Sequence, residues 1–164
     1  MKKCEFEWVD DKHLKLSGII DEYCSFAEVF KKLKDEIWID FSGITRINSS
    51  GVREWVQEVV KSDVKIHFEN CSSVIVDQFS MIPEFLGRNG IVESFAVHYV
   101  CENCSFETQK NFVVGKDIQP GKEDYDEVSE IKCPSCGYEQ MELDHNPDIY
   151  FAFLKFIKSN QQAS

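Results

Sequence analysis

The chain has 164 residues, of which 43% are hydrophobic and 13% aromatic, and its formal net charge is −11 at pH 7. This length is enough for one well-buried domain with a small appendage, and the composition excludes a disordered or fibrous protein. The negative charge repels nucleic acid and anionic lipid, so it favours a basic partner over an acidic one.

The two ends of the sequence contain no apolar run of targeting or membrane-spanning length. Met1, Lys2 and Lys3 are followed by charged residues, which is not the pattern of a signal peptide. Residues 149–154 form an apolar stretch near the C-terminus that is too short to cross a bilayer. We therefore expect a cytoplasmic protein with no membrane partner.

The first forty residues predict a hairpin, a helix and a strand. Residues 4–9 and 13–20 carry strand-like apolar patterns on either side of a charged turn. Ser25 and Glu28 form a capping box that predicts a helix over residues 26–34. The strand expected at 36–41 has apolar side chains on both faces, so we expect it to be central and covered on both sides.

The next sixty residues continue the alternation of helices and strands. A second amphipathic helix is expected to begin near Ser49 or Ser50, followed by a strand at 64–68 and a helix at 72–82. A further strand is expected over about 92–100. This order predicts an α/β fold with a mixed sheet of four to five strands and helices packed on it.

The C-terminal third changes character after residue 98. Residues 116–132 are acidic and poor in apolar side chains, which predicts a long loop or loose hairpin. Asn146 and Pro147 are typical of a helix start, so a last helix is expected over 147–158. Apolar residues surround most of this helix, which leaves two interpretations open: burial against the sheet or a homodimer contact.

Four of the seven cysteines form two matched pairs, Cys101 with Cys104 and Cys133 with Cys136. Two such pairs at this separation can place four thiolates at the corners of a tetrahedron. We predict a zinc ribbon over residues 99–145, with a structural zinc because four thiolates leave no open coordination position. Rubredoxin-like iron is the alternative metal. A redox disulfide between the cysteines is a weaker alternative to metal binding.

The charge of this segment argues against nucleic acid as its partner. Four lysines and nine acidic residues lie between residues 99 and 140, and four thiolates on one zinc add further negative charge. Such a surface cannot neutralise phosphates, so protein contact or stapling of the chain is the better interpretation.

The remaining reactive side chains show no catalytic pattern. Cys4, Cys24 and Cys71 are scattered, so we expect reduced thiols without chemistry of their own. The four histidines are isolated from one another and from any nucleophile with a base beside it. The chain is therefore predicted not to be an enzyme.

The segment between the third strand and the second helix is the best candidate for function. Asn48, Ser49, Ser50 and Gly51 furnish the expected helix start, where free backbone N–H groups favour a negative charge. Simple capping by Asn48 or Ser49 is the other interpretation.

Residues 5–98 resemble the STAS domain, the fold of bacterial anti-sigma factor antagonists. The resemblance rests on the order of elements, on residues 39–44 (Ile-Asp-Phe-Ser-Gly-Ile), and on Asn48-Ser49-Ser50-Gly51, which is similar to the family's phosphorylation loop. The chain departs from the family in having Asn48 where the family usually has aspartate. The division implied is a STAS-like domain at 1–98, joined by helix 147–158, and the zinc ribbon at 99–145.

This resemblance implies a non-enzymatic regulatory module. In the family, a partner that is both an anti-sigma factor and a serine kinase phosphorylates the first serine of the loop, which here is Ser49, and so switches off binding. The docking loop would then consist of Asn48, Ser50 and Gly51 around that serine. The alternatives are a rubredoxin-like electron carrier and a docking scaffold with a zinc ribbon but no phosphorylation switch.

Overall fold

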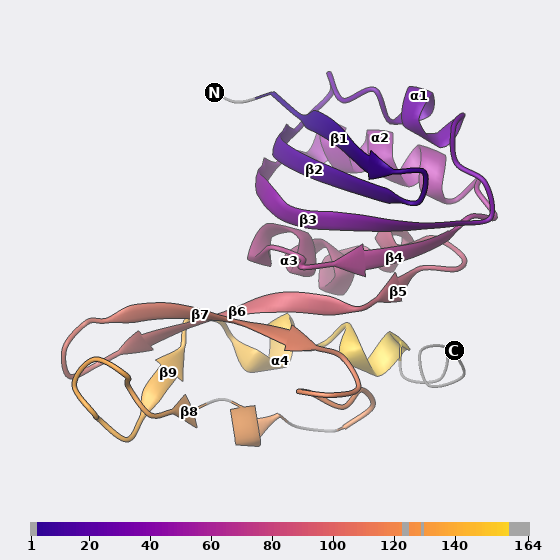
Figure 1. Ribbon diagram of the computed structural model, residues 1–164. Helices are drawn as coiled ribbons and strands as arrows, with labels where there is room; N and C mark the ends of the chain where they lie inside the picture. Colours follow the sequence, from indigo (N-terminus) through magenta and orange to yellow (C-terminus); the bar gives the residue numbers. More distant parts are fainter. Residues whose placement is uncertain (1–2, 123–124, 129, 158–164) are drawn as a thin grey trace.

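The computed structural model describes residues 3–157 except 123, 124 and 129, and it contains a mixed sheet with helices on it and a second, smaller sheet (Figure 1). In the first sheet β1 is antiparallel to β2, and the neighbours from β2 to β5 are parallel. The five strands, in their order across the sheet, are β1 (Glu5–Asp10), β2 (His13–Ile20), β3 (Glu36–Ile47), β4 (Lys65–Glu69) and β5 (Ile91–Val92).

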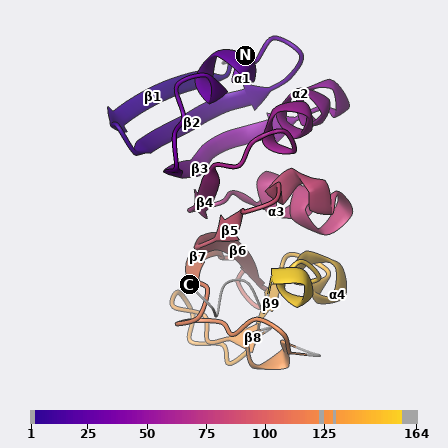
Figure 2. The same cartoon turned by 90° about the vertical axis from the view of Figure 1, so that its right-hand side faces the viewer.

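The helices lie on one face of this sheet (Figure 2). They are α1 (Phe26–Phe30), α2 (Ser49–Val59), α3 (Ser73–Met81) and the short 3-10 helix η1 (Pro83–Leu86). β3 is the central strand, as predicted, but the expectation that it is covered on both sides is wrong. Ile37, Ile39 and Phe41 are buried under the helices, whereas Trp38 and Asp40 on the other face remain partly exposed.

The predicted elements are present with changed lengths. The hairpin and the helix start at Ser49 are confirmed, while the first helix ends at Phe30 instead of residue 34. β3 continues to Ile47, because Gly43 lets it run against β2: a Cβ on Gly43 would lie 2.6 Å from that of Ser17. The strand expected over 92–100 is two strands that part at Glu93.

The second sheet is antiparallel and begins inside the segment assigned to the first domain. It consists of β7 (Glu107–Val113), β6 (Ser94–Cys101), β9 (Met141–Leu143) and β8 (Glu130–Ile131), with the 3-10 helix η2 (Asp126–Val128) before β8. β6 therefore runs across residue 98. An isolated parallel bridge between Cys71 and Phe95 joins it to the chain just beyond β4.

The C-terminal segment packs on α3 and β6. α4 (Pro147–Tyr150) is followed by a turn and then by a helical stretch at 154–157, so the predicted continuous helix is interrupted, and residue 158 lies outside the described residues. The Phe153 ring lies 5.5 Å from that of Phe79 and 5.2 Å from that of Phe95.

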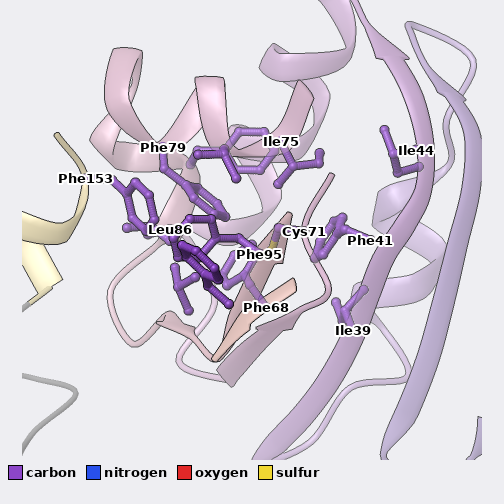
Figure 3. Close-up of a cluster of buried hydrophobic side chains, with 14 of the residues drawn as sticks. Ile39, Phe41, Ile44, Phe68, Cys71, Ile75, Phe79, Leu86, Phe95 and Phe153 are labelled. Carbon is purple, nitrogen blue, oxygen red and sulfur yellow. The ribbon is translucent and has the colours of Figure 1, made fainter. Parts of the chain in front are cut away.

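One hydrophobic core runs through both sheets (Figure 3). Ile39 and Phe41 of β3 meet Phe68 of β4, and Phe95 and Phe153 continue the same cluster beyond α3. The buried cysteines Cys101 and Cys133 belong to this cluster as well. The two sheets therefore share their interior, so a change in the packing of one sheet affects the packing of the other.

None of the helices in the described part of the chain is both long and apolar enough to span a bilayer.

Candidate functional site

The four predicted metal ligands come together at the tips of two hairpins. Their Sγ atoms all lie within 4.8 Å of one another, with 3.7 Å between Cys101 and Cys136 and 3.7 Å between Cys104 and Cys133. A tetrahedral ion with metal–sulfur bonds of about 2.3 Å has sulfur–sulfur edges of about 3.8 Å. The cluster therefore fits a four-thiolate metal, zinc or iron alike.

The first hairpin turn connects β6 to β7 and presents Cys101 and Cys104. The backbone N–H of Ser105 donates to the carbonyl of Cys101 at 2.8 Å, and the N–H of Cys101 donates to the carbonyl of Phe106 at 2.8 Å. Ser105 has a φ of 63°, a left-handed conformation that non-glycine residues rarely adopt. This turn directs both thiols to the same point.

The second turn, between β8 and β9, repeats the first. The N–H of Gly137 donates to Cys133 at 2.9 Å, the N–H of Cys133 donates to Tyr138 at 2.7 Å, and Gly137 has a φ of 78°. The two turns have the same hydrogen bonds and the same backbone conformation, although the first has neither the proline nor the glycine of the second. The site is therefore built from two equivalent halves.

Donors favour the thiolate form, which a metal requires, at Cys136. Asn103 Nδ2 donates to Cys136 Sγ at 3.5 Å, and this bond, with the backbone N–H of Tyr138, lowers the pKa of Cys136 to about 6. At Cys104 the backbone N–H of Phe106 acts in the same direction, but burial and the neighbouring thiols outweigh it and raise the pKa to about 11. The nearby carboxylates oppose additional negative charge: Glu102 raises the pKa of Glu142 by repulsion. A cation of high charge at the cluster relieves this repulsion.

The loop before α2 is a capped helix start with an exposed serine. Asn48 Oδ1 accepts from the N–H of Gly51 at 2.8 Å, so the capping interpretation is confirmed for Asn48. Ser49 is exposed at the first position of the helix and Ser50 is half-buried. Asn48 Nδ2 also donates to Glu22 Oε2 at 3.2 Å. The backbone N–H of Glu22 itself and then this bond lower the pKa of Glu22.

Gly51 lets the helix approach the end of β2. A Cβ on Gly51 would lie 2.4 Å from the carbonyl oxygen of Ile20, which itself accepts from the N–H of Asn48 at 3.1 Å. No larger residue fits without moving the helix. The Asn-Ser-Ser-Gly order therefore has a packing reason beside any functional one.

A hollow of about 510 Å³ lies beside this loop, at the carboxyl ends of β2 and β3. Its lining includes Tyr23, whose side chain is 81% exposed, together with Arg46 and Asn48. In α/β sheets, ligands bind preferentially outside the carboxyl ends of parallel strands. The remaining lining residues are Lys3, Cys4, Ile19, Asp21 and Ile47.

The face of the sheet without helices carries a histidine site that sequence reasoning missed. His67 is 6% exposed, and its two ring nitrogens each lie 2.6 Å from a carboxylate oxygen, of Glu93 and Glu36. A carboxylate oxygen only accepts, so each ring nitrogen that carries a proton can donate to the carboxylate beside it. Trp38 lies between the rings of His67 and His13, with centroids 4.2 and 5.3 Å away.

This arrangement had no local signal in the sequence, because Glu36 and Glu93 are 31 and 26 residues away from His67. Only the strand register brings them together. Among the described residues, no histidine lies beside a nucleophile in a catalytic arrangement: His145 accepts from the N–H of His98 at 3.2 Å and stacks on Tyr150. The two hydrogen bonds of His67 therefore connect neighbouring parts of the sheet.

The C-terminal segment buries most of its apolar side chains. The homodimer interpretation rested on seven apolar residues: Ile149, Tyr150, Phe151, Phe153, Leu154, Phe156 and Ile157. Only Ile149 and Phe156 remain exposed, at 59% and 56%. Burial against α3 and β6 therefore accounts for five of them. A dimer contact, where one forms, would have to use these two side chains.

Comparison of this chain with protein-family models, with curated proteins and with solved structures found no match.

Proposed function

We propose that this chain is a non-enzymatic, STAS-like protein-interaction module that docks a protein partner, such as an anti-sigma factor or serine kinase, at the Asn48–Gly51 loop. The observation that carries the proposal is the exposed Ser49 at the start of α2, beside the hollow lined by Tyr23 and Arg46. A net charge of −11 favours a partner with a basic docking face.

The hollow suits a protein partner better than a small molecule. Its most exposed member, Tyr23, belongs to the residue types that are enriched in the centres of interfaces. Asn48 and Arg46 add groups that can donate hydrogen bonds to a partner's backbone or carboxylates. A side chain inserted into the hollow would be bordered by Asn48, the residue before Ser49.

Phosphorylation of Ser49 would switch this docking off. A phosphate adds about two negative charges at a point where Glu22 is already hydrogen-bonded to Asn48. The helix start tolerates the phosphate, but a partner packed on the loop would collide with this bulky group and would have to strip the water from its charges. Asn48 in place of the family's aspartate keeps the cap and removes one charge that a kinase would read.

The metal module is proposed to be a structural zinc ribbon that holds the second sheet together. Four thiolates close the coordination sphere, so the ion has no position for water or substrate. Bound there, zinc would crosslink the turn between β6 and β7 to the turn between β8 and β9. The negative charges around the site, including those of Glu102 and Glu142, repel phosphates and so disfavour nucleic acid as its partner.

An iron electron carrier is the second candidate, and one observation favours it. The first turn lacks the glycine that rubredoxins carry in both turns. Ser105 nevertheless has a positive φ like that of Gly137, so the lack of glycine does not exclude the turn that iron requires. Metal analysis and the visible spectrum of protein purified without added metal decide between them. Colourless protein with one equivalent of zinc supports the structural role, and a red iron protein supports the carrier.

The docking proposal is tested by copurification from native cells. Tagged wild-type chain is expected to retain one stoichiometric partner, and Ser49→Asp is expected to lose it. Ser73→Asp is the matched control, since Ser73 is the first residue of α3 and receives the same charge at the same helical position. Loss of the partner in both variants, or in neither, contradicts a switch at Ser49.

A further inference from the structure

The open face of the first sheet is the side opposite to its helices (Figure 2). Residues that are paired in the strand register point to the same side, so the register shows which charged side chains of β1 to β4 share this face. They are all at least partly exposed. The carboxylates are those of Glu5, Glu7, Glu36, Asp40 and Glu69, and the lysines are Lys15 and Lys65.

Negative charge therefore exceeds positive charge on the open face. Lys65 already lies 4.0 Å from Glu36, so it compensates one of the carboxylates. An anionic face repels nucleic acid, anionic lipid and the same face of a second copy of the chain. It attracts a protein surface that carries lysine or arginine.

A hollow of about 380 Å³ lies in this face. Trp38 and Val9, whose side chain is 67% exposed, form apolar parts of its lining. Asp40 and Glu69, which are paired in the register of β3 and β4, form an acidic part, and Lys15 lies among them. An arginine side chain has an apolar stem and a planar cationic end, so it matches both kinds of lining.

The two carboxylates paired across β3 and β4 differ in their own bonding. Asp40 Oδ1 accepts from the N–H of Ser42 at 2.8 Å and Oδ2 accepts from Asn70 Nδ2 at 3.0 Å, which fixes the direction of this carboxylate. Glu69 is half-buried and has no hydrogen bond or salt bridge from its side chain within the described part of the chain. Burial and the neighbouring carboxylates, Asp40 first, raise the pKa of Glu69, although His13 acts in the opposite direction. Charged Glu69 therefore costs stability and keeps its oxygens available to a partner.

Trp38 is held in place before any partner binds. Its ring lies between those of His13 and His67, with centroids 5.3 and 4.2 Å away. The His67 ring is in turn hydrogen-bonded to Glu36 and Glu93, at 2.6 Å each. A side chain that is already fixed loses little conformational entropy when a partner packs on it.

A bare metal ion fits this hollow less well than a basic side chain. Among the described residues, only the four cysteines bring ligand atoms close enough together to share one ion. Neighbouring strands lie about 4.8 Å apart, and a guanidinium group presents five N–H donors in a planar fork. It can therefore contact the carboxylates of Asp40 and Glu69 at the same time.

We propose that the open face of the first sheet docks a protein partner through a basic segment, with an arginine of that segment seated between Trp38 and the carboxylates of Asp40 and Glu69. None of the residues that line this hollow lines the one beside the Asn48–Gly51 loop. The open face is a second docking surface, and it does not depend on the docking proposed at Ser49.

The proposal is tested with a fluorescein-labelled peptide of six arginines, added to the full-length, metal-loaded chain at about 50 mM salt. Fluorescence anisotropy is expected to show binding that weakens as the salt concentration rises. The double variant Asp40→Asn with Glu69→Gln is expected to bind the peptide about fivefold more weakly. The charge-matched control is Glu84→Gln with Glu107→Gln, at exposed positions outside the open face, and it should retain the affinity of the wild type.

NMR of the indole N–H groups shows where the peptide binds. The chain has three tryptophans, and Trp55 is buried on the side of the helices, where its Nε1 donates to the carbonyl of Phe85 at 2.8 Å. The peptide is expected to shift the signal of Trp38, assigned with Trp38→Phe, and to leave the signal of Trp55 in place.

The single variant Glu69→Gln separates binding from folding, in case Asp40→Asn disturbs the turn at Ser42. Since Glu69 has no bonded partner to lose, Glu69→Gln is expected to melt no lower than the wild type and still to bind the peptide more weakly. A lower Tm together with unchanged peptide binding would assign Glu69 a structural role and contradict the proposal.

Three further results would overturn it. Equal weakening in both double variants would mean that net charge alone attracts the peptide. A shift at Trp55 without one at Trp38 would place the peptide elsewhere. A light-scattering mass of two chains that returns to one chain in Glu69→Gln would assign the open face to a second copy instead of a basic partner.

Discussion

At the scale of single residues, Ser105 shows how a backbone position can require glycine without containing it. Its φ of 63° corresponds to the φ of 78° at Gly137 in the matching turn. For a residue with a Cβ this conformation costs about 1–2 kcal/mol, a cost that glycine does not have. The converging thiols and the two backbone hydrogen bonds of the turn hold Ser105 in place.

We therefore expect Ser105→Gly to stabilise the folded, metal-loaded chain by about 1 kcal/mol, because it removes the cost of the left-handed conformation. The measurement is the midpoint of urea unfolding. Gly137→Ser is the mirror-image control and is expected to destabilise by a similar amount, since a Cβ at Gly137 meets nothing within 4 Å and only the backbone cost remains. A loss of stability in Ser105→Gly would contradict the equivalence of the two turns.

At the scale of elements, charged side chains connect the strands on the open face of the sheet. His67 of β4 is hydrogen-bonded to Glu36 of β3 on one side and to Glu93, between β5 and β6, on the other. The Trp38 ring, stacked on His67 at 4.2 Å, covers the pair from above. Charge-assisted hydrogen bonds of this kind are among the stronger polar contacts in proteins.

Acidification is expected to weaken this connection. The hydrogen bond from His67 lowers the pKa of Glu36 below its ordinary 4.5. A carboxyl whose pKa is lower in the folded than in the unfolded chain contributes stability above pH 4.5, and this contribution is lost as the pH falls through the folded-state pKa. The free energy of unfolding of the wild type should therefore fall more steeply below pH 4.5 than that of Glu36→Gln.

The measurement is urea unfolding at a series of pH values from 6 to 3. The Glu36→Gln chain is expected to be less stable at pH 6, and its curve should approach that of the wild type in acid. Glu107→Gln, at an exposed position of β7, is the control and should run parallel to the wild type. Parallel curves for Glu36→Gln as well would mean that the bond to His67 contributes nothing to stability.

The parts of the fold that depend on local pattern could be predicted, and those that depend on register could not. The start of α2 follows from Asn48 and the periodic apolar residues after it, and the cysteine cluster follows from spacing alone. The continuation of β3 through Ser42 and Gly43 was missed because these residues are typical of turns. Contacts such as those of His67 with Glu36 and Glu93 depend on the register of the strands.

At the scale of the whole molecule, the metal cluster and the first sheet share one interior. Cys101 and Cys133 lie in the same buried cluster as Leu14 of β2 and Phe68 of β4. β6 carries this continuity, since it bridges to Cys71 at one end and supplies Cys101 of the cysteine cluster at the other. A core that has no internal boundary is expected to unfold cooperatively.

Metal removal is therefore expected to destabilise the entire chain. Binding free energy of a structural ion is folding free energy, so chelation of the metal or Cys104→Ser should lower the Tm by roughly 10 °C or more. Calorimetry should show a single transition at the lower temperature, with the tryptophan signal of Trp55, under the first sheet, lost at the same point. Cys4→Ser is the control that should keep the metal. A metal-free chain in which Trp55 still reports the original melting temperature would contradict the shared core, since the first sheet would then fold independently of the cysteine cluster.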